Sequence, residues 1–282
     1  MCVNEHEFPL ESDYRIALGI EYKGTQYRGW QSQMKPIITV QDTVEKALSQ
    51  VANKKIQVVC AGRTDAQVHA SNQVVHFDTS VFRSNKSWIM GANANLPSDI
   101  SIIWAKKMDS RFHARFSATQ RRYRYIIYND PIRPAHLSDQ ITWNYRDLDF
   151  SKMQQASLYL IGRHDFSSFR ASHCQAKSPI KTISELKVYK NGKFIVLDIS
   201  ADAFLHHMVR NIAGVLMSIG SGLKSVDWMK QVLEAQDRAK GGVTAPPYGL
   251  YLVDVCYPKI FDMPKRYIGP NFLSYLDNSL SL

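Results

Sequence analysis

The sequence predicts an α+β fold made of two ferredoxin-like halves, each with the order strand, helix, strand, strand, helix, strand. Three observations predict it. Short apolar runs alternate with segments whose apolar residues recur at helical spacing. The same order occurs once before about residue 110 and again after it. The pair Asn191-Gly192, a strong hairpin signal, separates two apolar runs. We therefore expect a mainly antiparallel sheet with helices on one face and a binding cleft on the other.

The first half contains the clearest single strand. Residues 14–22 are mostly apolar and are closed by the turn Lys23-Gly24. Apolar side chains at helical spacing predict a helix over residues 40–52. The other elements expected in this half are strands at 56–61, 73–77 and 100–105 and a helix at 87–94.

The second half repeats this order. Residues 123–128 are aromatic and β-branched and predict a strand. The other elements expected here are helices at 151–161, 204–219 and 226–235 and strands at 180–189, 193–199 and 249–255. We place the boundary near Ser110, which gives halves of 1–110 and 111–282, and we expect an irregular surface segment after residue 258.

Charge and cysteine usage narrow the class of protein. Lys and Arg number 35 against 25 Asp and Glu, a net charge of +10 that favours a polyanionic partner such as a nucleic acid. The four cysteines are widely scattered, which argues against zinc-ribbon and thioredoxin-like sites and suits a reducing compartment. No segment approaches the ~20 apolar residues of a membrane span, and residues 1–13 lack an apolar signal core. We therefore expect a cytoplasmic protein without membrane contact.

One carboxylate stands out, in the segment Gly62-Arg63-Thr64-Asp65-Ala66-Gln67-Val68. It follows an apolar run, and loops held by strands often carry catalytic groups. Gly62 permits a sharp turn or a close approach to a ligand. Asp65 is therefore a candidate nucleophile acting on a polyanion, although an Asp in such a loop also serves commonly as an Asx-turn or helix cap.

The predicted strand around residue 123 interleaves arginine and tyrosine. Alternate residues of a strand share a face, so Arg121, Tyr123 and Tyr125 lie together, with Arg122 and Arg124 opposite. Such a face is typical of a base-stacking platform with phosphate contacts. A cationic edge strand with aromatic cross-strand pairs explains the same pattern.

The predicted helix over residues 204–219 carries a polar group opposite its apolar stripe. His206 and Arg210 lie four residues apart and share that side. Arg210 could reach Asp65 and hold it ionised, although a solvated polar face explains the same pattern. We expect no metal site, because adjacent histidines on a helix point in different directions and His207 has no Cys or Glu ligand at useful spacing.

Taken together, these segments resemble the tRNA pseudouridine synthase A family, with motifs in the same order and spacing from about residue 14 to residue 270. The matching motifs are Gly62-Arg63-Thr64-Asp65-Ala66, Phe112-His113-Ala114-Arg115-Phe116, Arg122-Tyr123-Arg124-Tyr125, Asp165-Phe166-Ser167-Ser168-Phe169-Arg170, the run from His206 to Asn211, and Gly249-Leu250-Tyr251-Leu252-Val253.

The resemblance implies an enzyme that isomerises uridine to pseudouridine without a cofactor. It makes Asp65 the catalytic nucleophile or general base, and attack on C1′, attack on C6 and removal of the C2′ proton all stay open. It pairs Arg210 with that aspartate, makes Tyr123 the tyrosine that stacks on the target base, and makes Leu250 an apolar wall of the pocket. The two halves are then RRM-like, and the cleft on the face opposite the helices binds RNA.

The resemblance also implies a substrate and an assembly. The family acts at positions 38, 39 and 40 of the tRNA anticodon stem-loop, on a nucleotide flipped out of its stem, and works as a homodimer. The basic, aromatic and polar candidates for RNA contact are Arg63, His69, Arg83, Phe112, His113, Arg115, Phe116, Arg121, Arg170, His173, Gln175 and Lys177.

One residue departs from the family pattern: the usual loop has glycine where this chain has Gln67. If that position has a positive φ, the side chain costs roughly 1 kcal/mol or more.

Three other functions fit the residues alone. One is an RNA-binding protein without catalysis. A second is another RNA-modifying enzyme. A metal nuclease needs several clustered carboxylates, whereas Asp65 stands alone, and a methyltransferase needs a glycine-rich loop after its first strand, which Gly19 and Gly24 do not form. A third is a metabolic enzyme with an anionic substrate.

Overall fold

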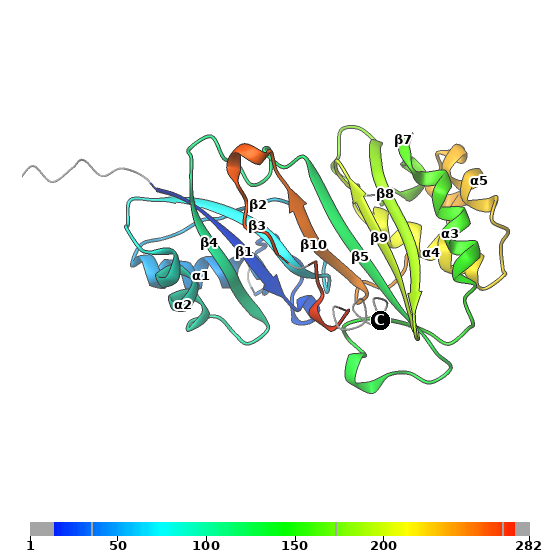
Figure 1. The fold of residues 1–282 in the computed structure, drawn as a ribbon, viewed down its shortest axis with the longest axis horizontal. Coiled ribbons are helices and arrows are strands. Elements are labelled where there is room, and N and C mark those ends of the chain that lie inside the picture. Colours follow the sequence, from blue (N-terminus) through cyan, green and yellow to red (C-terminus); the bar gives the residue numbers. More distant parts are fainter. Residues whose placement is uncertain (1–13, 35, 173, 267, 274–282) are drawn as a thin grey trace, which may run out of the picture.

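The computed structural model describes residues 14–34, 36–172, 174–266 and 268–273. Its framework is one mixed, mostly antiparallel sheet with the strand order β4-β1-β3-β10-β5-β9-β8-β7 (Figure 1). The α+β class expected from the sequence is therefore confirmed. The strands are β1 (Tyr14–Tyr22), β2 (Val59–Cys60), β3 (His69–Thr79), β4 (Ile100–Met108), β5 (Gln120–Asn129), β6 (Thr142–Asn144), β7 (Gly162–Asp165), β8 (Ile180–Asn191), β9 (Phe194–Ala201) and β10 (Leu250–Cys256).

Two helices, α1 (Val40–Ala52) and α2 (Asn85–Asn93), pack beside β1, β3 and β4. Helix α1 begins where the Thr39 side chain accepts a hydrogen bond from the Asp42 amide, and it ends at Asn53 in the left-handed conformation. Its buried stripe lies in the same core as the inward-facing residues of β1 and β3.

Three further helices cover the other end of the sheet, namely α3 (Phe150–Ser157), α4 (Met208–Gly220) and α5 (Trp228–Ala235). They lie on the same side of the sheet as α1 and α2 (Figure 1). Helix α4 is the most deeply buried, because Ile212, Val215 and Leu216 are fully covered by the core that also contains Tyr125 of β5. This arrangement confirms the prediction that the helices share one face.

Strand β10 joins the two ends of the sheet. It pairs in parallel with β3 and antiparallel with β5, so that Leu252 lies opposite both Ala70 and Tyr123. The sheet is therefore continuous across residue 110, and its central strand comes from late in the sequence.

The opposite face of the sheet carries a buried ion cluster. Asp198 accepts two hydrogen bonds from Arg122, at 2.6 and 2.8 Å, and one from Arg124, at 2.9 Å. Arg124 also donates to the carbonyls of Ile268 and Gly269, at 3.0 and 3.2 Å. The cluster thus ties the described part of the C-terminal segment to the sheet.

Several predicted boundaries need correction. The strand expected at 14–22 and the helix expected at 40–52 are confirmed without change. Strands β6 and β7 were not predicted. The strand expected at 56–61 is only Val59–Cys60. Ile56 and Val58 are buried, but their amides donate to the side chains of Ser49 and Glu45 rather than to a neighbouring strand. An apolar run can therefore pack into a core without joining a ladder.

The helix expected at 204–219 begins at Met208. His207 adopts the left-handed conformation with φ of 62°, which an α-helix does not accommodate. His206 and His207 therefore precede the helix and do not follow its periodicity.

Candidate active site

A pocket of about 1050 Å³ is lined by the β2–β3 loop, by β5 and β10, and by the segment leading into α4. Because Tyr123 and Tyr125 lie on the face that α4 covers, this pocket is on the helix side of the sheet, between the two groups of helices. The sequence placed the cleft on the opposite face, and that part of the prediction is corrected. The predicted residues that line the pocket are Arg63, Asp65, Arg115, Phe116, Arg121, Tyr123, Gln175, Arg210 and Leu250.

The loop that carries Asp65 is fixed by hydrogen bonds on both sides. The carbonyl of Thr64 accepts from the Trp30 amide at 3.0 Å, and the Thr64 hydroxyl lies 2.7 Å from that of Tyr22. The Gln67 amide donates to the carbonyl of Tyr27 at 3.2 Å. Asp65 is therefore presented from a backbone held by buried neighbours.

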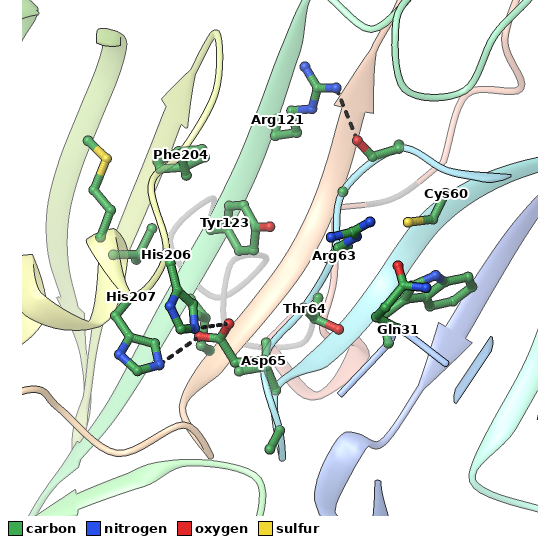
Figure 2. Close-up of a pocket in the computed structure, with 18 of the residues that line it drawn as sticks. Gln31, Cys60, Arg63, Thr64, Asp65, Arg121, Tyr123, Phe204, His206 and His207 are labelled. Carbon is green, nitrogen blue, oxygen red and sulfur yellow. Dashed lines mark hydrogen bonds and ion pairs between the residues drawn. The ribbon is translucent and has the colours of Figure 1, made fainter. Parts of the chain in front are cut away.

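Three basic side chains lie around the Asp65 carboxylate, and Figure 2 shows two of them, His206 and His207. His206 Nε2 lies 3.3 Å from Oδ1, and His207 Nε2 lies 3.5 Å from Oδ2. Arg210 Nη1 lies 3.6 Å from Oδ2, while its Nε donates to the carbonyl of Ala245 at 2.8 Å. The reach of Arg210 to Asp65 that the sequence suggested is thus present. The two histidines were not among the predicted site residues.

These neighbours decide the ionisation of Asp65. Burial acts to raise its pKa, but the hydrogen bond and charge of His206, and the charges of His207 and Arg210, outweigh burial and lower the pKa below its ordinary value. The pKa of His206 is raised, first by its hydrogen bond to Asp65. The pKa of His207 is lowered, mainly because the ring is partly buried. Asp65 is therefore an ionised carboxylate near neutral pH.

The approach of both histidines follows from the backbone before α4. The amide of Met208 donates to the carbonyl of Leu205, which closes a turn, and His207 has a positive φ. This turn brings the two rings to a centroid separation of 4.0 Å with both Nε2 atoms toward Asp65. The prediction that adjacent histidines diverge assumed a helix at these residues and is wrong. Predicting both histidines as neighbours of Asp65 would have required predicting the turn that precedes α4.

Tyr123 and Leu250 form part of the sheet wall of the pocket. Tyr123 is 8% exposed, and its ring packs edge to face against Phe204 at 5.0 Å. Burial raises the pKa of its hydroxyl, and the charge of Asp65 raises it further. Leu250 is also buried and lies opposite Tyr125 across the β10–β5 ladder.

An exposed aromatic and basic group lies at the pocket. Phe116 is 77% exposed, and its ring stacks on the ring of His113 with the centroids 4.3 Å apart. The Arg115 guanidinium carbon lies 5.6 Å from the centroid of the Phe116 ring. The His113 Nδ1 accepts from the amides of Arg115 and Phe116, which fixes the ring. This group offers a flat surface and a positive charge to a ligand.

The guanidinium of Arg121 is occupied by backbone carbonyls. It donates to those of Ala61 at 3.0 Å, Arg115 at 2.7 Å, Ala118 at 3.2 Å and Asp202 at 3.0 Å. These bonds connect the start of the Asp65 loop to the segment that leads toward His206. Arg121 therefore positions the walls of the pocket, in place of the direct RNA contact expected for it.

Other predicted RNA contacts lie elsewhere. His69 and Phe112 are 1% and 0% exposed, so neither offers a surface to RNA. The Nδ1 of His69 accepts from the Gly24 amide, and its Nε2 lies 3.0 Å from the carbonyl of Tyr248. These bonds make His69 a structural residue.

The remaining candidates are peripheral. Arg170 donates to the carbonyls of Cys174 and Ala176, and so supports the segment that carries Gln175. Arg83 and Lys177 are exposed and do not line the pocket. His173 lies outside the described residues.

Gln67 adopts φ of 65°, the left-handed conformation that favours glycine. We expect Gln67→Gly to raise the free energy of unfolding by about 0.5–1 kcal/mol, because relief of the left-handed strain exceeds the entropy that glycine adds to the unfolded chain. Urea denaturation measures this change. Gln67→Ala keeps the Cβ and should not stabilise; equal gains from both variants would contradict the backbone explanation.

Comparison with known proteins identifies the family of this chain. A family model described as tRNA pseudouridine synthase matches residues 19–117 and 156–258. The tRNA pseudouridine synthase A of Pseudomonas aeruginosa is 63% identical over 262 residues, which cover 93% of this chain and 92% of that protein. Proteins of the same name from Alcanivorax borkumensis and Coxiella burnetii are each 57% identical over 259 residues. Those matches cover 92% of this chain and 97% and 99% of the two relatives.

Asp65 is the one acidic residue among the described residues that line the pocket, where five arginines accompany it. Together with the sheet and the matches, this site defines an RNA-modifying isomerase that converts uridine to pseudouridine. The chain belongs to the tRNA pseudouridine synthase family. Within the described residues, no helix has the length and apolar character needed to cross a membrane.

Proposed function

We propose that this enzyme isomerises uridine at positions 38, 39 and 40 of the tRNA anticodon stem-loop, with Asp65 as the catalytic nucleophile or general base. The observation that carries the proposal is the ionised Asp65 carboxylate, held between His206, His207 and Arg210 in a basic pocket that Tyr123 lines. The resemblance of the motifs to the tRNA pseudouridine synthase A family supplies the positions in tRNA.

The reaction needs few groups. The bond between C1′ and N1 breaks, the uracil turns, and a bond forms between C1′ and C5. The C5 proton leaves and N1 gains a proton, so atoms balance without a redox partner. Asp65 can attack C1′, attack C6 or remove the C2′ proton, and an ionised carboxylate suits each route. Tyr123 would hold the freed uracil by stacking.

Access to a stem nucleotide requires base flipping, which costs a few kcal/mol of pairing and stacking. Arg63, Arg115 and Phe116 line the pocket and are exposed, so their charges and ring can offset that cost through phosphate contact and stacking. The net charge of +10 favours a binding mode led by phosphates and RNA shape, which tolerates different sequences.

The proposal has two further parts. The scattered cysteines support a cytoplasmic location, and the resemblance implies a homodimer that holds tRNA across both subunits.

The positions in tRNA can be mapped directly. Unmodified tRNAs with uridine at 38, 39 or 40 are incubated with the enzyme, and pseudouridine is located by carbodiimide modification and reverse transcription. We expect pseudouridine at each of these positions and none where cytidine replaces uridine. Modification confined to another part of the tRNA would overturn the assignment, and binding without any pseudouridine would favour a non-catalytic RNA-binding protein.

A further inference from the structure

Asp65, His206 and His207 form a cluster of potential metal ligands. One ligand atom from each, a carboxylate oxygen and two imidazole nitrogens, can be chosen so that all three lie within 4.8 Å of one another. All three side chains are partly accessible from the pocket, with side-chain exposures of 22%, 39% and 29%. A small ion can therefore reach them.

The spacing of these atoms comes close to that of a tetrahedral site. Metal–ligand bonds of about 2.0–2.1 Å at tetrahedral angles place neighbouring donor atoms roughly 3.3 Å apart. His206 Nε2 lies 3.3 Å from Asp65 Oδ1, and His207 Nε2 lies 3.5 Å from the other oxygen, Oδ2. Because the two histidines face different oxygens, the carboxylate would bind an ion through both oxygens or turn to share one, and the three ligand atoms would draw together from their present separation of up to 4.8 Å.

The donor types select the metal. Two imidazoles and one carboxylate favour Zn²⁺ and neighbouring transition metals, whereas Mg²⁺ and Ca²⁺ prefer oxygen ligands. The positively charged Arg210 guanidinium, 3.6 Å from Asp65 Oδ2, repels a cation bound at this site. Its Nε bond to Ala245 restrains it from moving away. This repulsion points to an affinity weaker than that of a structural zinc site.

We infer that Asp65, His206 and His207 bind Zn²⁺ or a similar divalent transition-metal ion, and that the bound ion inhibits the enzyme. Inhibition rests on the proposed role of Asp65, because a metal-bound carboxylate cannot act as nucleophile or base. Binding itself does not depend on that role. The ion is thus a reversible inhibitor of the pocket and is not required for catalysis.

Binding can be measured on the full chain without an activity assay. Zn²⁺ is titrated into wild-type protein against a chromophoric zinc chelator, and Co²⁺ is followed by its visible absorption. We expect one ion per chain. His206→Ala and His207→Ala should each weaken binding by roughly tenfold or more, because each removes a direct ligand. Circular dichroism verifies that the variants are folded.

One control separates this site from general surface binding. His136→Ala removes an exposed histidine outside the pocket. This variant should keep the wild-type affinity. Wild-type affinity in both His206→Ala and His207→Ala would overturn the inference. Absence of binding to the wild-type protein at about 100 μM Zn²⁺ would overturn it as well.

Activity gives a separate arm. With a tRNA substrate, Zn²⁺ should inhibit in the concentration range in which it binds, and excess chelator should restore the rate. Activity that persists at full occupancy would refute the inhibitory role. If the site binds Zn²⁺ but positions 38, 39 and 40 are never modified, the metal site stands and the proposed function fails.

Discussion

Asp65→Asn should reduce pseudouridine formation by about 10⁴-fold or more while changing tRNA affinity little. The amide has nearly the same shape as the carboxylate, so the pocket is kept. It carries no charge and is neither a nucleophile nor a base of useful strength. The rate is measured by tritium release from tRNA labelled at C5 of uridine, and affinity by filter binding.

A matched control for this variant is Asp147→Asn, which removes one carboxylate charge from an exposed residue that does not line the pocket. Its rate should equal that of the wild type. Tritium release by Asp65→Asn at the wild-type rate would remove Asp65 from the mechanism. Loss of tRNA binding in parallel with loss of rate would instead make Asp65 a binding residue.

The largest effect on stability is expected at Asp198. Asp198→Ala should lower the free energy of unfolding by about 3–5 kcal/mol, because it removes the buried carboxylate that accepts hydrogen bonds from both Arg122 and Arg124. The side chains of Asp198 and Arg124 are only 6% and 8% exposed, so solvent screens the pair weakly. Urea denaturation followed by circular dichroism measures the loss.

Two comparisons test this explanation. Asp109→Ala breaks an ion pair with Arg111 at the surface and should leave the unfolding midpoint nearly unchanged. Replacing Asp198 and Arg124 together with leucine removes both buried charges and should recover part of the loss. A small effect of Asp198→Ala, similar to that of Asp109→Ala, would show that the cluster contributes little.

Local pattern was enough for much of this fold. The strand at 14–22 and the helix at 40–52 were predicted with correct ends, because the first has a clear turn after it and the second has a regular apolar stripe. The strand at 56–61 was overestimated because its amides bond to side chains of α1, which no pattern within the run reveals.

The residues of the site likewise fall into those that the sequence predicted and those that it did not. Asp65, Tyr123 and Arg210 were found because each belongs to a recognisable motif, and the structure gathers them in one pocket. His206 and His207 were missed as partners of Asp65, because a helical reading of their segment turned the rings apart. The RNA candidates His69 and Phe112 are polar or aromatic residues with no surface, and burial of this kind depends on distant parts of the chain.

The placement of β10 has a consequence for biosynthesis. Strand β3 ends at Thr79, but β10, its partner along one edge, begins only at Leu250. At a synthesis rate of 5–20 residues per second, that edge waits roughly 10–30 s for its neighbour. During this interval the nascent chain exposes unpaired backbone groups that can pair with other chains. Because β2 pairs with Val75 and His76, the residues of β3 that wait for β10 are those at its start, His69 and Ala70.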